Sequence, residues 1–505
     1  MTVIVQQPTD SNGNPQPMVY DQDTGKVIVD HDGYVLNGGQ RLVNVPSKAD
    51  FVSTAKTQTS GIQEAGIYAI ANGIGRINII GSYGNKFILN TNVLLYYDEV
   101  SNPTPPQPLE IVGIGEPYIQ ASTSFANTPI NGNSSYLTTM IVILNLPTLV
   151  TIKGLILDGN NTVEWGIAGT ANEVIVEYNK AINFTDTGIN ITSMDYSGQG
   201  TQIADKVIIR DNFCNNNAGS DINTEGMNEI ITNNMCFSGN GASTQTNIIA
   251  ETAVSVIITG NHCANAVSHA ITVESSSGNS VENGKVVVSN NICESSGDGI
   301  VINTEGSTQV LTDIIVEGNI IRKTTGTNAI LVEGTGTDKN VSIQGNIIAD
   351  TSATYEIYIG GGAVIENLNI HNNMIYNNTG SGTTRNPIYV TSGTTISGLK
   401  ISDNLIGAGE GQIVAPNSAG YNPLPTTPSV PASGTAQQNT NPYAVDVYIY
   451  GGDVTEIQIT KGGTAYTVLS VSTAIAMSGQ SYKLNPGDSI TITYSTAPSW
   501  EWLSD

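Results

Sequence analysis

Five glutamates recur at one point of a repeated phrase and are the side chains best suited to chemistry in this chain. Each lies three residues after an apolar residue, in INTEG ending at Gly226, IIAET at Thr252, ITVES at Ser275, INTEG at Gly306 and ILVEG at Gly334. The candidate residues are Glu225, Glu251, Glu274, Glu305 and Glu333. The corresponding positions of neighbouring phrases hold Thr192, Gly360 and Thr391. If the phrases stack, five carboxylates share one face.

Electrostatics limits what such a column can be. Two unit charges about 5 Å apart repel by roughly 1 kcal/mol in water, and by roughly 3–4 kcal/mol at an effective dielectric constant of about 20. The side chains can splay into solvent, hold protons through raised pKa values, or share a cation such as Ca²⁺. The column is therefore a solvent-facing ladder, a Ca²⁺ or carbohydrate site, or a catalytic acid pair. Apart from that Ca²⁺, the sequence predicts no cofactor.

Two further residue types belong to the candidate site. His269 begins the strand that carries Glu274 and can face the same side. Tyr355, Tyr358 and Tyr389 are candidates for stacking on sugar rings, although they can equally be core or interface residues. For catalysis the candidates are Glu251, Glu274 and Glu305, because carboxylates on adjacent coils suit the short separation of retaining glycosidases.

A repeated asparagine phrase must position these residues. From about residue 150 the phrase runs apolar strand, Asn, apolar pair, turn and second strand, as in VIIRDNFC, VIITGNHC and IIVEGNII. Successive asparagines are 33, 22, 27, 30, 28, 27, 27 and 31 residues apart. The predicted ladder is Asn179, Asn212, Asn234, Asn261, Asn291, Asn319, Asn346, Asn373 and Asn404. Constant strands with variable loops predict coils stacked about 4.8 Å apart, with Asn amides bonded along the axis.

All four cysteines occupy one slot of this phrase. Cys214, Cys236, Cys263 and Cys293 each follow the aligned Asn by two residues, and later coils place Ile there. The slot is therefore an apolar core position, which predicts a column of buried thiols. Disulfides between adjacent coils remain sterically feasible, whereas a linear stack does not give the tetrahedral geometry of a zinc site.

The fold class predicted is all-β: a right-handed parallel β-helix with an N-terminal capping helix and a small C-terminal β-sandwich-like module. The predicted domains are an attachment region at 1–55, the β-helix at 56–415, a Pro/Ser/Thr-rich linker at 416–442 and the β module at 443–505. A helix is expected at 60–73, where Ser60 and Gln63 fit a capping box. This helix would cover the open first coil.

Composition narrows the partners. The 505 residues carry 18 Lys and Arg against 43 Asp and Glu, a formal net charge of −25, so nucleic acid is an unsuitable partner. No stretch is long enough to span a membrane as a helix. Residues 1–17 lack the basic start of a signal peptide, which favours a cytosolic protein or release without a cleaved signal, for example by virion assembly and lysis.

The order of elements resembles the pectate-lyase-like superfamily, which includes phage tailspikes. The helix is followed by NIIGSYGNKFIL, LEIVGIGEPYIQAS and VTIKGLILDGNN, over about residues 60–165, and the coils extend the likeness to about residue 415. Residues 441–505 resemble C-terminal modules of tailed-phage and archaeal-virus structural proteins, which often end in a phrase like APSWEWL. The resemblance implies the fold more than the chemistry, because the fold serves lyases, hydrolases, epimerases and inert adhesins.

These features lead to one expectation and two alternatives. We expect a spike or fibre on the virion surface, or otherwise extracellular, that attaches to a host glycan or receptor. It would be a homotrimer in contact with other virion proteins. One alternative is a polysaccharide lyase or glycoside hydrolase that uses the Glu column. The shortage of Lys and Arg disfavours it, because enzymes of this fold usually carry Asp, Lys, Arg or His beside the acids. The other alternative is a structural capsid decoration or filament subunit.

Overall fold

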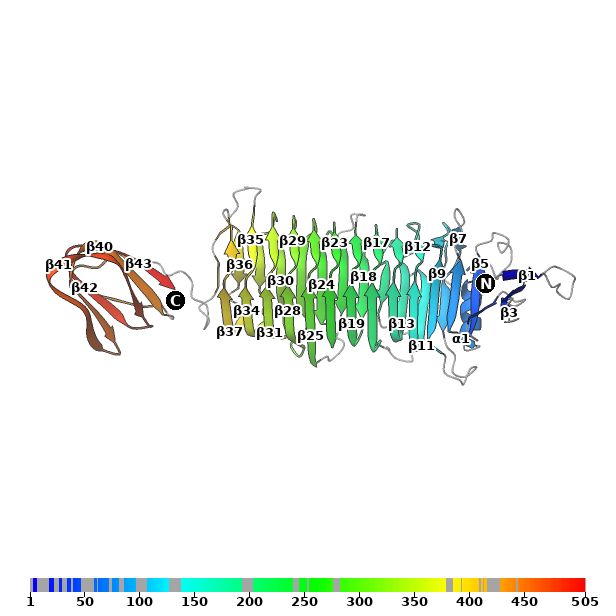
Figure 1. The fold of residues 1–505 in the computed structure, drawn as a ribbon, viewed down its shortest axis with the longest axis horizontal. Coiled ribbons are helices and arrows are strands. Elements are labelled where there is room, and N and C mark those ends of the chain that lie inside the picture. The colour runs from blue at the N-terminus through cyan, green and yellow to red at the C-terminus, as the bar shows by residue number, and fades with distance from the viewer. Residues whose placement is uncertain are drawn as a thin grey trace.

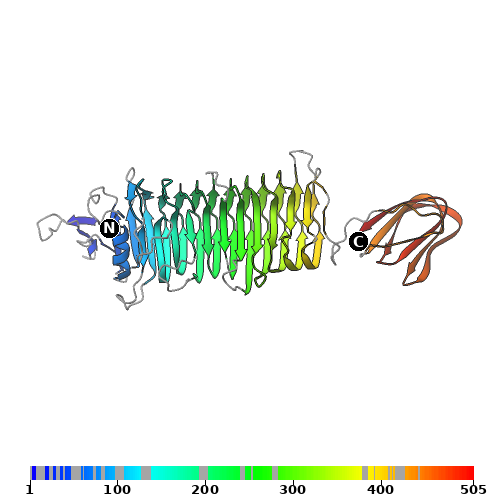
Figure 2. The same cartoon turned by 180° about the vertical axis from the view of Figure 1, so that it is seen from behind.

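The structure is a computed structural model of the chain. It describes residues 3–6, 18–21, 27–29, 34–37, 40–46, 59–60, 62–71, 75–80, 86–96, 107–126, 138–192, 203–238, 245–251, 254–275, 282–377, 385–391, 393–407, 410–411, 413–415, 427–441 and 444–504. A long stack of coils fills the middle of the molecule, with the C-terminal sheet beyond one end and the N-terminal strands beyond the other (Figures 1 and 2). The predicted parallel β-helix is confirmed, because strands of successive coils pair in parallel along the whole stack.

Each coil contributes strands to three faces, and the face with the glutamates is called the carboxylate sheet. Its strands are β8 (Val93–Tyr96), the first part of β11 (Thr139–Lys153) and of β13 (Trp165–Glu177), β15 (Ile189–Ile191), β18 (Ser220–Glu225), β21 (Thr246–Glu251), β24 (His269–Ser275), β27 (Asp298–Thr304), β30 (Asn328–Gly334), β33 (Tyr355–Ile359) and β36 (Asn386–Val390). Strands β11 and β13 bend at shifts of register and continue into the next face.

The second face is called the back sheet. It consists of β5 (Gln40–Pro46), β6 (Arg76–Ile80), β9 (Leu109–Ile114), the second parts of β11 and β13, β16 (Lys206–Arg210), β19 (Asn228–Thr232), β22 (Ser255–Thr259), β25 (Glu282–Ser289), β28 (Val310–Glu317), β31 (Thr337–Gln344), β34 (Val364–His371) and β37 (Thr395–Ser402).

The third face is called the short sheet. It holds β7 (Lys86–Leu89), β10 (Tyr118–Ala121), β12 (Ile156–Asp158), β14 (Lys180–Ile182), β17 (Phe213–Asn215), β20 (Met235–Phe237), β23 (His262–Ala264), β26 (Ile292–Glu294), β29 (Ile320–Arg322), β32 (Ile347–Ala349), β35 (Met374–Tyr376) and β38 (Leu405–Ile406). Inward Ile, Val and Leu side chains from all three faces form one continuous core along the axis.

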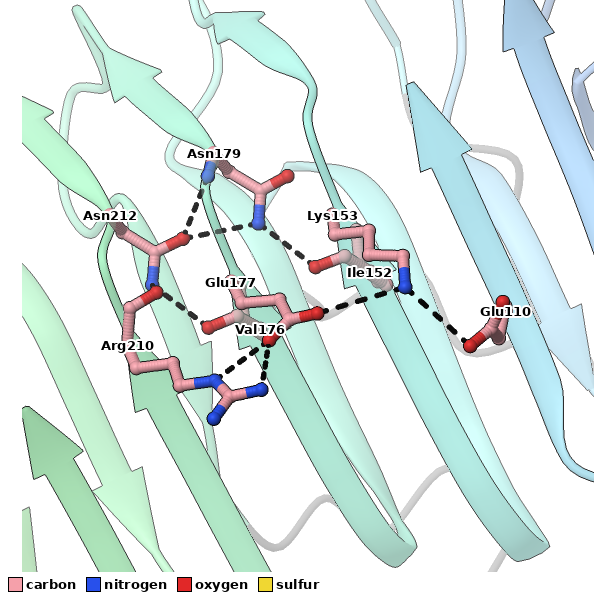
Figure 3. A network of polar contacts seen from close by, with 8 residues as sticks. All are labelled: Glu110, Ile152, Lys153, Val176, Glu177, Asn179, Arg210 and Asn212. Atoms are coloured by element: carbon pink, nitrogen blue, oxygen red, sulfur yellow. Dashed lines mark hydrogen bonds and ion pairs between the residues drawn. The ribbon is translucent and has the colours of Figure 1, made fainter. Parts of the chain in front are cut away.

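The asparagine ladder runs between the back sheet and the short sheet. In each step the backbone N–H and the Nδ2 of one Asn donate to the Oδ1 of the next, as from Asn261 to Asn291 at 2.9 and 3.0 Å. The same geometry repeats from Asn179 to Asn404. Figure 3 shows its start, where Asn179 Nδ2 also donates to the Ile152 carbonyl at 2.9 Å.

A second sequence feature fixes this corner. The residue before each ladder Asn has a positive φ, such as 55° at Asn233 and 68° at Gly260. These positions hold Asn, Asp or Gly in every coil from Asp211 to Asp403, because an L side chain in this region is otherwise strained. The dipeptide thus makes the turn, and the ladder satisfies its buried amides.

The cysteines lie in register at the centre of the short sheet. Cys214 pairs with Cys236, Cys236 with Cys263, and Cys263 with Cys293, and Ile321 continues the column. All four are buried free thiols. Burial raises the pKa of Cys293 to about 12. The column therefore behaves as apolar core, as the sequence predicted.

Helix α1 (Ile62–Ala71) covers the first coil at the N-terminal end (Figure 1). Its face of Ile62, Ala65, Ala69 and Ile70 is buried in the common core. The capping box predicted for this helix is wrong: the Ser60 hydroxyl donates to the Ile88 carbonyl, and the Gln63 side chain accepts from the Leu94 backbone N–H. Beyond the helix, β1 (Val3–Gln6), β2 (Met18–Asp21), β3 (Val27–Val29) and β4 (Tyr34–Asn37) pair antiparallel, and β4 pairs with β5.

The C-terminal module is an antiparallel sheet with its own core. It contains β39 (Ala436–Gln438), β40 (Val445–Lys461), β41 (Thr464–Leu484), β42 (Ser489–Thr496) and β43 (Ser499–Ser504). Trp500 and Trp502 are buried in this core, and Trp500 Nε1 donates to the Pro428 carbonyl at 2.7 Å. The segment predicted as a linker at 416–442 thus supplies β39 and the chain at residues 427–428 to the C-terminal sheet.

Candidate functional site

On the outer face of the carboxylate sheet, core and outward residues alternate over the second half of each strand. In β24, Ile271 and Val273 point into the core, so Thr272 and Glu274 belong to the outer face. The outer residues in register with Thr272 are called the floor column. Its members are Leu94, Val142, Ala168, Asn190, Asn223, Ile249, Thr272, Val301, Leu331, Tyr358 and Tyr389.

The glutamates lie beside this floor, two residues further along each strand. Glu225 pairs in register with Glu251, and Glu251 with Glu274. The next coil places Asn303 there, followed by Glu333. The prediction that Glu305 occupies this column is wrong, because Ile300 and not Ile302 pairs with Ile271. The two INTEG phrases have the same letters but are offset by two residues relative to their coils.

Glu305 nevertheless belongs to the same cluster. The Nδ2 of Asn303 donates to Glu305 Oε1 at 3.1 Å. Burial raises the pKa of Glu251, Glu274 and Glu333, and the negative charge of Glu305 raises each of them further. Because the charge of Glu305 acts on glutamates of three other coils, its carboxylate lies among them. The chain therefore gathers carboxylates on four consecutive coils of partly desolvated surface.

An acid missed by the sequence reasoning lies on the other side of the floor column. Asp298 pairs in register with His269, and the His269 Nδ1 lies 3.7 Å from Asp298 Oδ2. Burial lowers the pKa of His269, while the Asp298 charge opposes this shift. Asp298 also accepts a hydrogen bond from the Asn328 backbone N–H at 2.8 Å, and its charge raises the pKa of Glu333. Alignment of strand starts, rather than strand ends, would have placed it beside His269.

A second missed acid, Glu229, lies behind the glutamate column. It occupies a core position that holds Val207 and Val256 in the adjacent coils and is 1 % exposed. The Thr224 hydroxyl donates to Glu229 Oε2 at 2.9 Å. Burial raises its pKa well above the usual range, and the charges of Glu225 and Glu251 add to this. In the sequence NEIIT, Glu229 stands where the adjacent coils have Val207 and Val256, and this acid at an aliphatic position could have revealed it.

The three tyrosines meet at the C-terminal end of the floor column. Ring centroids of Tyr355 and Tyr389 are 4.5 Å apart, and those of Tyr355 and Tyr358 are 5.0 Å apart. The rings of Tyr358 and Tyr389 are stacked, with 7° between their planes. Burial and neighbouring charges, Glu333 among them, raise the pKa of Tyr358. This tyrosine cluster therefore adjoins the carboxylates and has half-buried rings.

Three polar atoms of the floor column have no hydrogen-bond partner: Asn190 Oδ1, Asn223 Oδ1 and the Thr272 hydroxyl. Thr272 is 2 % exposed, and its hydroxyl forms no hydrogen bond. It lies between Ile249 and Val301 in the floor column and two residues from Glu274. Because buried hydroxyls are nearly always paired in native proteins, this one is suited to a ligand that lies over the floor.

Among the described residues, no group of three or more His, Cys, Asp or Glu side chains is placed to hold a metal ion. The Ca²⁺ predicted at the glutamate column stays a prediction. In the described part of the chain, no helix is long and apolar enough to cross a membrane.

Comparisons with known proteins give a fold and no sequence family. No protein-family model matches the chain, and no curated protein matches it. The Agl-KA catalytic domain is similar with a TM-score of 0.51 and 16% identity, over 75% of this chain and 69% of that chain. Endo-xylogalacturonan hydrolase from Aspergillus tubingensis is similar with a TM-score of 0.45 and 13% identity, over 75% of this chain and 98% of that chain. A tailspike protein of E. coli bacteriophage HK620, solved with a pentasaccharide, has a TM-score of 0.39 and 11% identity, over 92% of this chain and 93% of that chain.

At such identities the likeness extends to the fold alone. Together with the parallel pairing of the strands, it defines the chain as a right-handed parallel β-helix protein.

Proposed function

We propose that this chain binds a glycan along the outer face of the carboxylate sheet. The observation that carries the proposal is the tyrosine cluster next to partly desolvated carboxylates on consecutive coils. Aromatic rings stack on the apolar faces of sugars, and carboxylates accept hydrogen bonds from sugar hydroxyls. A ladder of such groups along one axis suits a linear chain of sugars. The unpaired Thr272 hydroxyl gives a further polar contact on the floor.

We further propose that binding serves attachment to a host surface, as a virion spike or fibre. Support comes from the elongated stack, with separate strands at either end (Figure 2). The resemblance of residues 441–505 to viral structural modules points the same way. In such an assembly one end module would anchor the spike, and other virion proteins would contact it there.

A homotrimer is part of this proposal. An outward aliphatic column runs along the back sheet, formed by Ile175, Ile208, Ile230, Ile257, Val287 and Ile315. These side chains are only partly buried, and an apolar stripe parallel to the axis suits copies packed side by side. Light scattering of the full chain should give three times the 52.9 kDa mass. A monomer at micromolar concentration contradicts the trimer.

The binding proposal is tested on a glycan array with the full chain. We expect a defined set of glycans to be retained, and Tyr389→Ala to weaken that binding roughly tenfold by loss of stacking. Tyr466→Ala, an exposed tyrosine of the C-terminal sheet, is the matched control. Absence of binding to every surface glycan of susceptible cells would contradict the proposal.

Glycoside hydrolysis is the second candidate, and the raised pKa values favour it. Burial and neighbouring carboxylates raise the pKa of Glu274, as a general acid requires, while Asp298 and His269 lie on the opposite side of the floor. If the chain cleaves its ligand, new reducing ends should appear, and Glu274→Gln and Glu251→Gln should each slow their release by a hundredfold or more, the contribution of an acid catalyst. Bound but intact glycan after prolonged incubation excludes this candidate. Repetition with a chelator tests the predicted Ca²⁺.

A further inference from the structure

The charge on the outer face of the carboxylate sheet is one-sided. Within the described residues, no lysine or arginine forms an ion pair with the clustered acids Glu251, Glu274, Glu305 and Glu333. Lysines and arginines of the other two faces form ion pairs with acids on those faces. Lys153 and Arg210 pair with Glu177 on the back sheet (Figure 3), and Arg322 and Lys323 pair with Glu294 on the short sheet. A polyanionic glycan would meet repulsion on the coils that carry these four acids.

The desolvation of these acids makes the missing countercharge costly. Burial is the largest cause that raises the pKa of Glu251, Glu274 and Glu333, and neighbouring carboxylates add to it. A ligand that brings positive charge to this face would relieve both effects, because charge pairs are stronger in a partly desolvated setting. The face is therefore suited to a cation that arrives with the ligand.

The spacing suggests how that charge is distributed. Successive coils lie about 4.8 Å apart, close to the length of one pyranose unit in an extended chain. Glu251 and Glu274 occupy adjacent coils, Glu305 extends from the next, and Glu333 follows. One carboxylate per coil thus meets one sugar unit per coil.

The tyrosine cluster is also suited to a ligand that carries both sugar rings and positive charge. Tyr358 lies in the coil after Glu333, and its ring packs over Gly360, the residue in register with the glutamate column. Aromatic faces attract ammonium groups as well as sugar rings. The unpaired Thr272 hydroxyl belongs to the coil of Glu274, two residues before it, where it can contact a hydroxyl or an amine of the ligand.

We infer that the ligand of this face is a cationic glycan, a chain of amino sugars with free amino groups, bound with one ammonium per coil against the glutamates and with terminal rings on the tyrosine cluster. The inference rests on the proposed glycan binding and specifies its chemical class.

The experiment compares three tetrasaccharides with the full chain in calorimetry: glucosamine, N-acetylglucosamine and galacturonate oligomers. The glucosamine tetramer should bind at least roughly tenfold more tightly than its N-acetylated counterpart, and the galacturonate tetramer should not bind. Affinity for the glucosamine tetramer should fall as salt is raised from about 0.05 to 0.5 M. Equal affinity for the first two tetramers, or binding of the uronate, overturns the inference and leaves glycan binding intact.

Variants separate a specific charge contact from the overall acidity of the protein. Glu274→Gln should weaken the glucosamine tetramer roughly tenfold and leave the N-acetylated one unchanged. The control Glu366→Gln removes the same charge on the back sheet, where Glu366 pairs with Lys339 at 3.2 Å, and should have no such effect. Equal losses in both variants overturn the inference, as does failure of all three tetramers to bind. In the last case the glycan array decides on the proposed function separately.

Discussion

At the scale of single residues, several acids occupy positions where a solenoid normally has aliphatic side chains. Asp338 pairs in register with Leu311 and Ile365 and is 0 % exposed. The Thr304 hydroxyl donates to Asp338 Oδ1 at 2.5 Å, and the other carboxylate oxygen has no partner. Burial raises the pKa of Asp338 to about 7, and that of Glu356 to about 7 and of Asp221 to about 6. In the folded protein these groups therefore keep their protons to a higher pH than in the unfolded chain.

Asp338 gives a prediction for stability against pH. The folded state holds this proton more tightly than the unfolded chain, whose pKa is 3.8. The contribution to stability is therefore complete below about pH 4 and is lost as pH rises through about 7. Asp338→Asn, which mimics the protonated acid, should raise the free energy of unfolding at pH 8 by up to about 4 kcal/mol and have little effect at pH 4. Denaturant unfolding at both pH values measures this.

The control is Asp403→Asn, an exposed residue with a φ of 57° that Asn also adopts readily. Its stability should follow the unmodified chain at both pH values. A gain at pH 8 in the control, or none in Asp338→Asn, would show that the buried charge is not the cause.

At the scale of elements, the ladder corner carries a large share of the stability. The Asn291 Oδ1 accepts from both the backbone N–H and the Nδ2 of Asn261, and its own Nδ2 donates to the Ile258 carbonyl at 3.0 Å. Asn291→Ala leaves buried donors and a carbonyl without partners. We expect a loss of about 3 kcal/mol in the free energy of unfolding, since each unpaired buried group costs about 1–3 kcal/mol.

Asn228→Ala provides the comparison, because Asn228 is exposed and makes one hydrogen bond, to the Asp205 carbonyl. Its effect should stay within about 0.5 kcal/mol. Denaturation midpoints with equal slopes establish both values. A neutral Asn291→Ala variant would mean that the ladder satisfies the turn without adding stability.

The same elements explain what the sequence could reveal. The asparagine and cysteine columns were predictable because every coil repeats the same turn. Identical residues at the same distance from that turn therefore lie in register. Glu305 was misplaced because β27 begins two residues earlier relative to its phrase, and nothing in INTEG marks that shift. Asp298 and Glu229 were missed because each occurs in one coil only, while repetition was the signal used. Which side chains meet across the floor depends on where each strand begins, and the sequence of a single coil does not define that point.

At the scale of the whole molecule, the chain contains two cores that do not merge. The solenoid core ends near Leu399, and the C-terminal core is formed by residues from Val445 to Trp502. Residues 427–441 close the C-terminal sheet: Thr427 accepts from the Trp502 backbone N–H at 3.0 Å, and Tyr494 Oη donates to the Pro431 carbonyl at 2.7 Å.

A fragment of residues 427–505 should therefore fold alone, with the emission of buried Trp500 and Trp502. A fragment of residues 443–505 lacks β39 and the Pro428 and Pro431 acceptors and should unfold at a lower temperature. Thermal unfolding followed by tryptophan emission compares them. Equal melting temperatures would show that residues 427–441 only pass over the sheet.

The asparagine ladder makes the length of this rod adjustable in whole steps. Each rung meets the next through the same bonds, and 27 residues separate Asn319 from Asn346 and Asn346 from Asn373. Deletion of one 27-residue coil would bring two equivalent asparagines together and shorten the rod by one coil. Evolution could thus change the reach between the two ends without redesigning either.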